Sequence, residues 1–165
     1  MTNDKKILVV GVGNILLSDE GIGVRVIQEL EKYPTAEDIE LLDAGTDIFT
    51  IMSSDTSYRT IIVVDAIRGN KTPGTVFCYP VVEDLNVETD NNSIHQIQIV
   101  EALKLMKRTI EKFHNTNIKL IGVEPAQIEY GVGLSTTIEQ KVETLVELVK
   151  KEIKNARSIA RPKYN

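Results

Sequence analysis

Two alternating patterns limit the fold of this chain more than any other feature of its sequence. Short runs rich in β-branched and other apolar residues lie at residues 6–10, 40–42, 60–64, 75–79 and 118–121. Runs that suit helices lie between or after them, at residues 22–33, 49–53, 93–113 and 136–155. Strands that alternate with helices predict an α/β sandwich with a mainly parallel sheet.

One predicted strand should run against the others. Residues 65–74 show no helical pattern, and the sequence KTPG at 71–74 is typical of a turn. A parallel crossover needs about a dozen residues or more. We therefore expect the strand at 75–79 to run antiparallel to the strand at 60–64. The polar, acidic segment 81–92 is predicted to be a surface loop, and Thr136 is predicted to cap the last helix together with Glu139.

Composition narrows the function classes. The 165 residues suit a single domain over residues 1–165, and the net charge of −5 disfavours nucleic acid as the main partner. There is no apolar run of about 18 residues for a membrane span, and no signal-peptide core near Met1. The sole cysteine, Cys78, excludes a disulfide or a cysteine-cluster metal site within one chain, so we expect a cytoplasmic protein.

The last residues are basic, unlike the rest of the chain. Residues 150–163 contain six Lys and Arg residues and one acid, Glu152. They fit either a solvated helix end with a flexible tail over residues 157–165, or a docking surface for an acidic partner.

Sites in open α/β sheets form at the carboxyl ends of the strands. Four predicted strands are followed there by carboxylates, which are Asp19-Glu20, Asp43, Asp65 and Glu124. Gly11 and Gly13 begin like a dinucleotide-binding fingerprint, but Leu16 stands where its third glycine belongs. These glycines are therefore more simply explained as residues that let the loop leave the sheet with positive φ.

Three of the polar residues are candidate metal ligands, and each also has an ordinary structural explanation. Glu20 or Asp19 can favour a helix N-terminus, Asp65 can cap a buried strand, and His95 can be a plain residue of a first helical turn. Together, Glu20, Asp65 and His95 offer two oxygens and a nitrogen. This set suits zinc or nickel and leaves a coordination position open.

Six segments then resemble, in order, the motifs of the NiFe-hydrogenase maturation endopeptidases. They are ILVVGVGNILLSDEGIGV at 7–24, LDAGT at 42–46, VVDA at 63–66, PGT at 73–75, SIHQ at 93–96 and GVEP at 122–125. The resemblance implies a twisted five-stranded sheet with helices on both faces, and hence a three-layer α/β sandwich.

The same resemblance implies an activity. Such an enzyme removes a short C-terminal peptide from the hydrogenase large-subunit precursor once nickel is installed. The family's metal-contacting residues fall on Glu20, Asp65 and His95, and the nickel comes with the substrate, so no permanent cofactor is expected. Asp43, Gly45 and Thr46 are expected to line the cleft. Either the metal or Asp65 can activate the attacking water.

Two other classes of function compete with a peptidase. One is a metal- or nucleotide-binding module without proteolysis, and the other is a chaperone that only docks on the precursor. A complete phosphate-binding motif would favour the module, and the sequence contains none. For a chaperone, the precursor would keep its mass after mixing.

Overall fold

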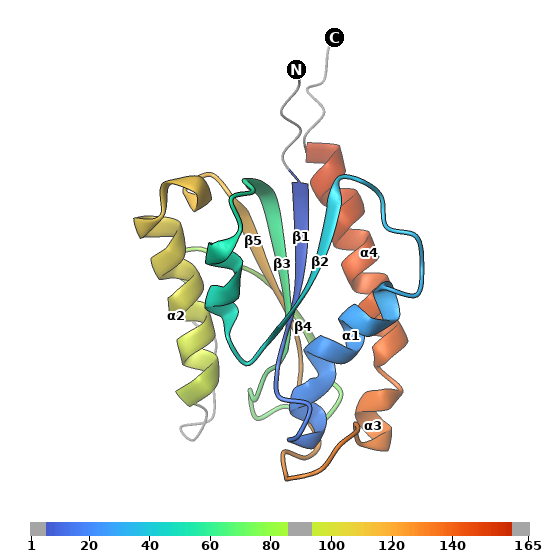
Figure 1. The fold of residues 1–165 in the computed structure, drawn as a ribbon. Helices are drawn as coiled ribbons and strands as arrows, with labels where there is room; N and C mark the ends of the chain where they lie inside the picture. Colours follow the sequence, from blue (N-terminus) through green and yellow to red (C-terminus); the bar gives the residue numbers. More distant parts are fainter. Residues whose placement is uncertain (1–5, 86–93, 160–165) are drawn as a thin grey trace.

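The computed structural model describes residues 6–85 and 94–159, with the side chains of residues 94–98 left out. Five strands form one twisted sheet in the order β2-β1-β3-β5-β4 (Figure 1). The strands are β1 (Lys6–Val12), β2 (Ile39–Gly45), β3 (Tyr58–Ala66), β4 (Val76–Pro80) and β5 (Asn117–Val123). Strands β2, β1, β3 and β5 pair in parallel, and only the β4–β5 pair is antiparallel.

Helices cover both faces of this sheet. The α-helices are α1 (Ile22–Leu30), α2 (Ile94–Thr109), α3 (Thr136–Glu139) and α4 (Val142–Ile159). Three 3-10 helices are η1 (Ser18–Gly21), η2 (Ile48–Ser53) and η3 (Glu111–Phe113). Figure 1 shows α1 and α4 on one face and α2 and η2 on the other. The prediction of a three-layer α/β sandwich is confirmed. None of the helices within 6–85 and 94–159 is both long and apolar enough to cross a bilayer.

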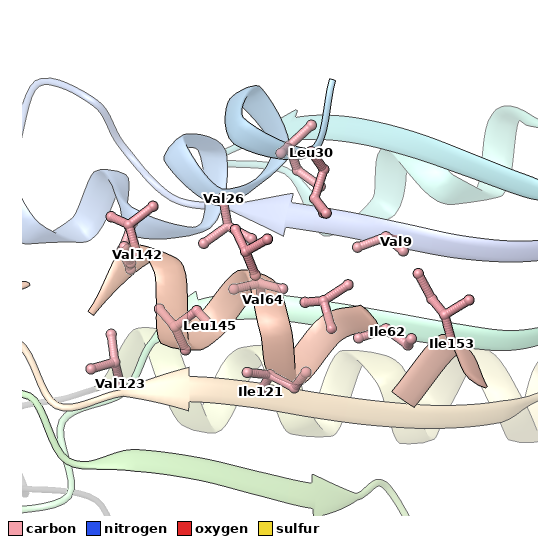
Figure 2. Packing of buried hydrophobic residues seen from close by; sticks show 14 of the residues in the cluster. Val9, Val26, Leu30, Ile62, Val64, Ile121, Val123, Val142, Leu145 and Ile153 are labelled. Atoms are coloured by element: carbon pink, nitrogen blue, oxygen red, sulfur yellow. The ribbon is translucent and has the colours of Figure 1, made fainter. Parts of the chain in front are cut away.

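The core is split by the sheet into two apolar clusters. Because side chains alternate along a strand, Ile7 and Val9 pack on one face while Leu8 and Val10 pack on the other. Figure 2 shows the first cluster, where Leu145 of α4 lies against strand residues such as Val64 and Ile121. A strand with both faces buried explains the unbroken apolar runs in the sequence.

The direction of β4 is as predicted, but its neighbour is β5. The chain leaves β3 through residues 67–75 and returns on the far side of β5, which later inserts between β3 and β4. Glu124 at the end of β5 holds this connection, since its backbone N–H donates to Thr75 O (2.8 Å) and its carbonyl accepts from Gly74 N (2.8 Å). The length of the connection predicts the direction of β4. It does not predict that β5 inserts between β3 and β4.

The C-terminal helical region differs from its prediction in three ways. It divides into α3 and α4, and its N-cap is Ser135, not Thr136. Ser135 is held outside the helix because its N–H and hydroxyl both donate to Asp19. The helix also ends later than predicted, because α4 continues to Ile159 and so includes the first residues of the expected tail. The Arg157 guanidinium binds the Asp38 carboxylate and stabilises this last turn (Nε–Oδ2 2.9 Å). Residues 160–165 lie outside the described part of the chain.

Candidate active site

The loop between β1 and α1 is seated tightly against the carboxyl end of the sheet. Gly13 has φ +148°, and a Cβ there would stand 1.8 Å from the carbonyl oxygen of Glu20. Gly23 allows α1 to begin directly on the sheet, because its Cβ position is 2.3 Å from the carbonyl oxygens of both Val12 and Val64. These two glycines therefore bring η1 against the end of β3, which it contacts.

Asp19 is a structural residue. It is fully buried, and its carboxylate accepts four hydrogen bonds. The donors are the N–H groups of Ala126 (2.9 Å), Gln127 (2.9 Å) and Ser135 (2.7 Å) and the hydroxyl of Ser135 (2.9 Å). Asp19 thus ties η1 to the loop that connects β5 and α3. Of the two adjacent acids, only Glu20 is left for chemistry.

Asp65 ends β3 as a buried carboxyl group, with 2% of its surface exposed. Burial raises its pKa well above the usual range, and the charge of Glu20 raises it further. The N–H of Ala66 donates to Oδ1 (2.8 Å) and acts in the opposite direction. Because the charge of Glu20 acts on Asp65, the two carboxylates lie near each other. Their role as a joint metal site stays a prediction.

His95 belongs to the first turn of α2, but its side chain lies outside the described residues. Figure 1 shows that α2 begins at the end of the sheet where β1 and β3 finish. Among the described side chains, no three His, Cys, Asp or Glu residues lie close enough to hold a metal ion. The metal site of Glu20, Asp65 and His95 therefore stays a prediction.

The three predicted cleft residues lie at the same end of the sheet, where Asp43 and Gly45 belong to the last three residues of β2 and Thr46 follows the strand. Asp43 and Thr46 are exposed, and the Asp43 carboxylate accepts a hydrogen bond from Gly45 N (2.8 Å). Gly45 needs its lack of a side chain, because its φ is +54°. Its carbonyl accepts from Gly13 N (2.7 Å), so this turn is linked to the glycine loop of β1. Contact of Asp43, Gly45 or Thr46 with a substrate stays a prediction.

Glu124, the fourth carboxylate at a strand end, is structural like Asp19. It is buried, and its Oε2 accepts hydrogen bonds from Gly69 N (2.6 Å) and Lys71 N (3.2 Å). The carboxylate holds the loop that follows Asp65. The sequence marks Glu124 by its position but does not distinguish this role from that of a metal ligand.

Sequence reasoning missed a cavity of about 240 Å³ beside η1. Its walls come from the two loops at this end and from α1, and include Ile15, Gly21, Val132 and Leu134. The signal in the sequence was the glycine-rich, apolar segment YGVGL at 130–134.

Residues 24–152 match the hydrogenase maturation protease family. The chain is 36% identical over 146 residues to the hydrogenase 2 maturation protease of Escherichia coli K12, covering 87% of this chain and 88% of that protein. It is 31% identical over 159 residues to a putative hydrogenase maturation protease of Methanocaldococcus jannaschii, covering 91% and 97%. The solved structure of the hydrogenase maturating endopeptidase HybD from E. coli superimposes with a TM-score of 0.78 at 34% identity, covering 92% of this chain and 93% of that one.

Proposed function

The chain belongs to the hydrogenase maturation protease family, and from this premise we propose that it removes the C-terminal extension of a NiFe-hydrogenase large-subunit precursor after nickel insertion. Family membership makes the chain an endopeptidase, which favours proteolysis over a binding module or a docking chaperone. The observation that supports the site is the buried Asp65 carboxyl group under the influence of Glu20.

The nickel in this proposal is part of the substrate. Glu20 and Asp65 supply carboxylate oxygens and His95 supplies an imidazole nitrogen to nickel that the precursor holds with cysteine thiolates. A cation between Glu20 and Asp65 offsets their repulsion and favours the ionised form of Asp65. Precursor without nickel lacks this anchor, so cleavage acts as a check on metal insertion.

Bond cleavage needs a polarised carbonyl and an activated water. Nickel bound to the three side chains can polarise the scissile carbonyl, and Asp65 can accept a proton from water once it is ionised. Asp43, Gly45 and Thr46 are proposed to contact the precursor beside this point.

We also place the reaction in the cytoplasm. Cys78 is exposed and free, which suits a reducing compartment. The net charge of −5 agrees with a protein partner in place of a nucleic acid.

The decisive experiment mixes the protein with nickel-loaded precursor and weighs the products. Glu20→Gln, Asp65→Asn and His95→Ala should keep the fold and cut at least about 100-fold more slowly, because the loss of groups that merely support a metal ligand already costs about 10–100-fold. Matched controls are Glu31→Gln and His114→Ala, which are exposed at the C-terminal end of α1 and at the end of η3. They should cut at the wild-type rate.

Two outcomes count against the proposal. Wild-type cleavage rates in all three site variants refute the assigned residues. Equal cleavage of nickel-free and nickel-loaded precursor refutes the role of nickel.

A further inference from the structure

Four large apolar side chains are exposed on two neighbouring loops at the carboxyl end of the sheet. Their exposed fractions are 51% for Ile15, 58% for Leu16, 94% for Tyr130 and 82% for Val132. We call these four residues the apolar rim. Scattered apolar residues on a surface need no explanation, but a group on adjoining loops marks an interaction site.

Hydrogen bonds hold the two loops together. Ser18 N donates to Gly131 O (3.0 Å), and Gly131 N donates to Leu16 O (3.0 Å). The buried Asp19 carboxylate adds its bonds to Ala126, Gln127 and Ser135. The exposure of the apolar rim is therefore built into a well-bonded backbone and is not a result of loosely held loops.

The cavity beside the apolar rim is chemically suited to an uncharged group. Ile15, Val132 and Leu134 line it with apolar surface. Its two charged lining residues, Arg25 and Glu139, bind each other (3.2 Å), and Arg25 also pairs with Glu29. With these charges already neutralised, the cavity favours an apolar side chain.

Position identifies the molecule that supplies this side chain. Gly21 lines the cavity and directly follows Glu20, while Ile15 and Leu16 lie on the same short loop. A polypeptide bound at Glu20 therefore lies beside the cavity and the apolar rim. A second copy of this chain seated there would cover the same site.

We propose that the apolar rim is a docking surface for the large-subunit precursor, and that the cavity takes an apolar side chain from the precursor segment beside the scissile bond. This inference rests on the proposed function and adds a recognition surface that works without nickel. Nickel contact selects precursor that is ready for cleavage, and the apolar rim supplies binding energy common to every precursor molecule.

The test replaces two rim residues together, as Leu16→Ser with Val132→Ser. Both side chains are exposed, and the hydrogen bonds between the two loops are made by backbone groups of Leu16, Ser18 and Gly131, so the fold should survive. KM for nickel-loaded precursor should rise about tenfold, equivalent to about 1.4 kcal/mol, with kcat within twofold of wild type. The conservative pair Leu16→Met with Val132→Ile should restore the wild-type KM.

Matched controls are Leu105→Ser and Val82→Ser. These residues are exposed to a similar degree, 48% and 51%, on α2 and on the loop after β4. They should leave KM unchanged. If they raise KM as much as the rim pair does, the effect is general loss of surface hydrophobicity and the proposal is wrong.

A binding measurement separates this inference from the proposed function. The affinity of Asp65→Asn for precursor is measured with and without the rim substitutions. If the rim pair weakens binding while the wild type does not cut, the docking surface stands and the proposed function fails. Cleavage by the wild type with equal KM and affinity in the rim pair overturns the docking surface alone. Absence of both binding and cleavage overturns the docking surface and the proposed function. If the protein is a dimer, and the rim pair dissociates it without affecting precursor binding, the apolar rim belongs to a contact with a second copy.

Discussion

At the scale of single residues, three acids at one end of the sheet have three different environments. Asp19 is buried and accepts four hydrogen bonds, so its charge is compensated. Asp65 is almost as buried, and among the described residues its carboxyl accepts one hydrogen bond, from Ala66 N, while the charge of Glu20 acts on it. Glu20 is half-buried. The difference in compensation, more than residue type, separates the structural acid Asp19 from Asp65 and Glu20, the two acids proposed for the site.

The raised pKa of Asp65 has a consequence for stability. The folded protein keeps the proton of Asp65 to a higher pH than the unfolded chain, whose aspartates titrate near about 3.9. Stability is therefore lost as pH rises from that value to the folded pKa, and the penalty persists above it. Asp65→Asn removes the charge and keeps an oxygen for Ala66 N. It should be more stable than wild type at pH 8 by at least about 1 kcal/mol, and equal to it near pH 3.5.

Urea unfolding of wild type and Asp65→Asn between pH 3.5 and 8 measures this difference. The exposed Asp43→Asn is the control and should track the wild type at every pH. A constant gap between Asp65→Asn and wild type over the whole range contradicts the assignment of a raised pKa.

At the scale of elements, the site depends on how closely α1 approaches the sheet. Gly23 is in the first turn of α1, where a Cβ would stand 2.3 Å from the carbonyl oxygens of Val12 and Val64. Both oxygens belong to the central strands β1 and β3, so the clash cannot be relieved by rotating a side chain. Any larger residue at position 23 has to push α1 outward, together with the adjoining η1 that carries Glu20.

Gly23→Ala should therefore lower both stability and activity. We expect a loss of about 2–3 kcal/mol in the free energy of unfolding, typical of an overpacked core. Cleavage should slow at temperatures where the variant is still folded, because Glu20 is displaced. The matched control is Gly131→Ala, whose Cβ would have Ser18 Oγ at 3.5 Å as its nearest neighbour. Equal melting temperatures for the two variants would falsify the close seating of α1.

Boundaries of elements are harder to predict than their presence, and Ser135 shows why. The sequence pattern predicts Thr136 as the cap, whereas the structure has Ser135 there, and either a serine or a threonine hydroxyl suits the position. The choice is made by Asp19, 116 residues away, which binds Ser135 N and Oγ. The residues around Ser135 do not indicate this distant partner. The end of α4 was misjudged for the same reason, because its partner Asp38 lies 119 residues away.

At the scale of the whole molecule, the fold class followed from the alternation of patterns, but the strand order did not. The direction of β4 depends on the connection 67–75, and the sequence shows that this connection is too short for a parallel crossover. Its pairing with β5 depends on a strand that comes 37 residues after β4 ends, at Asn117. The proximity of Glu20 and Asp65 was predictable in principle, because they follow β1 and β3, which are neighbours at the centre of the sheet.

Asp38 joins three elements outside the apolar core. Asp38, just before β2, accepts from Arg59 of β3 (2.9 Å) and from Arg157 in the last turn of α4 (2.9 Å). The Arg157 guanidinium, and Arg59 after it, hold the pKa of Asp38 below its usual value, against the opposing effect of burial. The contribution of Asp38 to stability is thus present above the unfolded pKa of about 3.9 and is lost as pH falls through the lower folded pKa.

Asp38→Asn should reduce the free energy of unfolding at pH 7 by about 1 kcal/mol, a modest value because the three side chains are partly exposed and solvent screens them. The reduction should shrink in 0.5 M NaCl, since salt screens exposed charges, and should vanish below the folded pKa of Asp38, where the wild-type carboxyl is also neutral. Asp55→Asn, an exposed acid between η2 and β3, is the control and should change stability little under any of these conditions.

Thermal unfolding at pH 7 and in acid, with and without salt, measures all of these effects. A loss that persists unchanged in acid shows that Asp38 acts through packing, and then the attachment of α4 to β2 and β3 is not electrostatic.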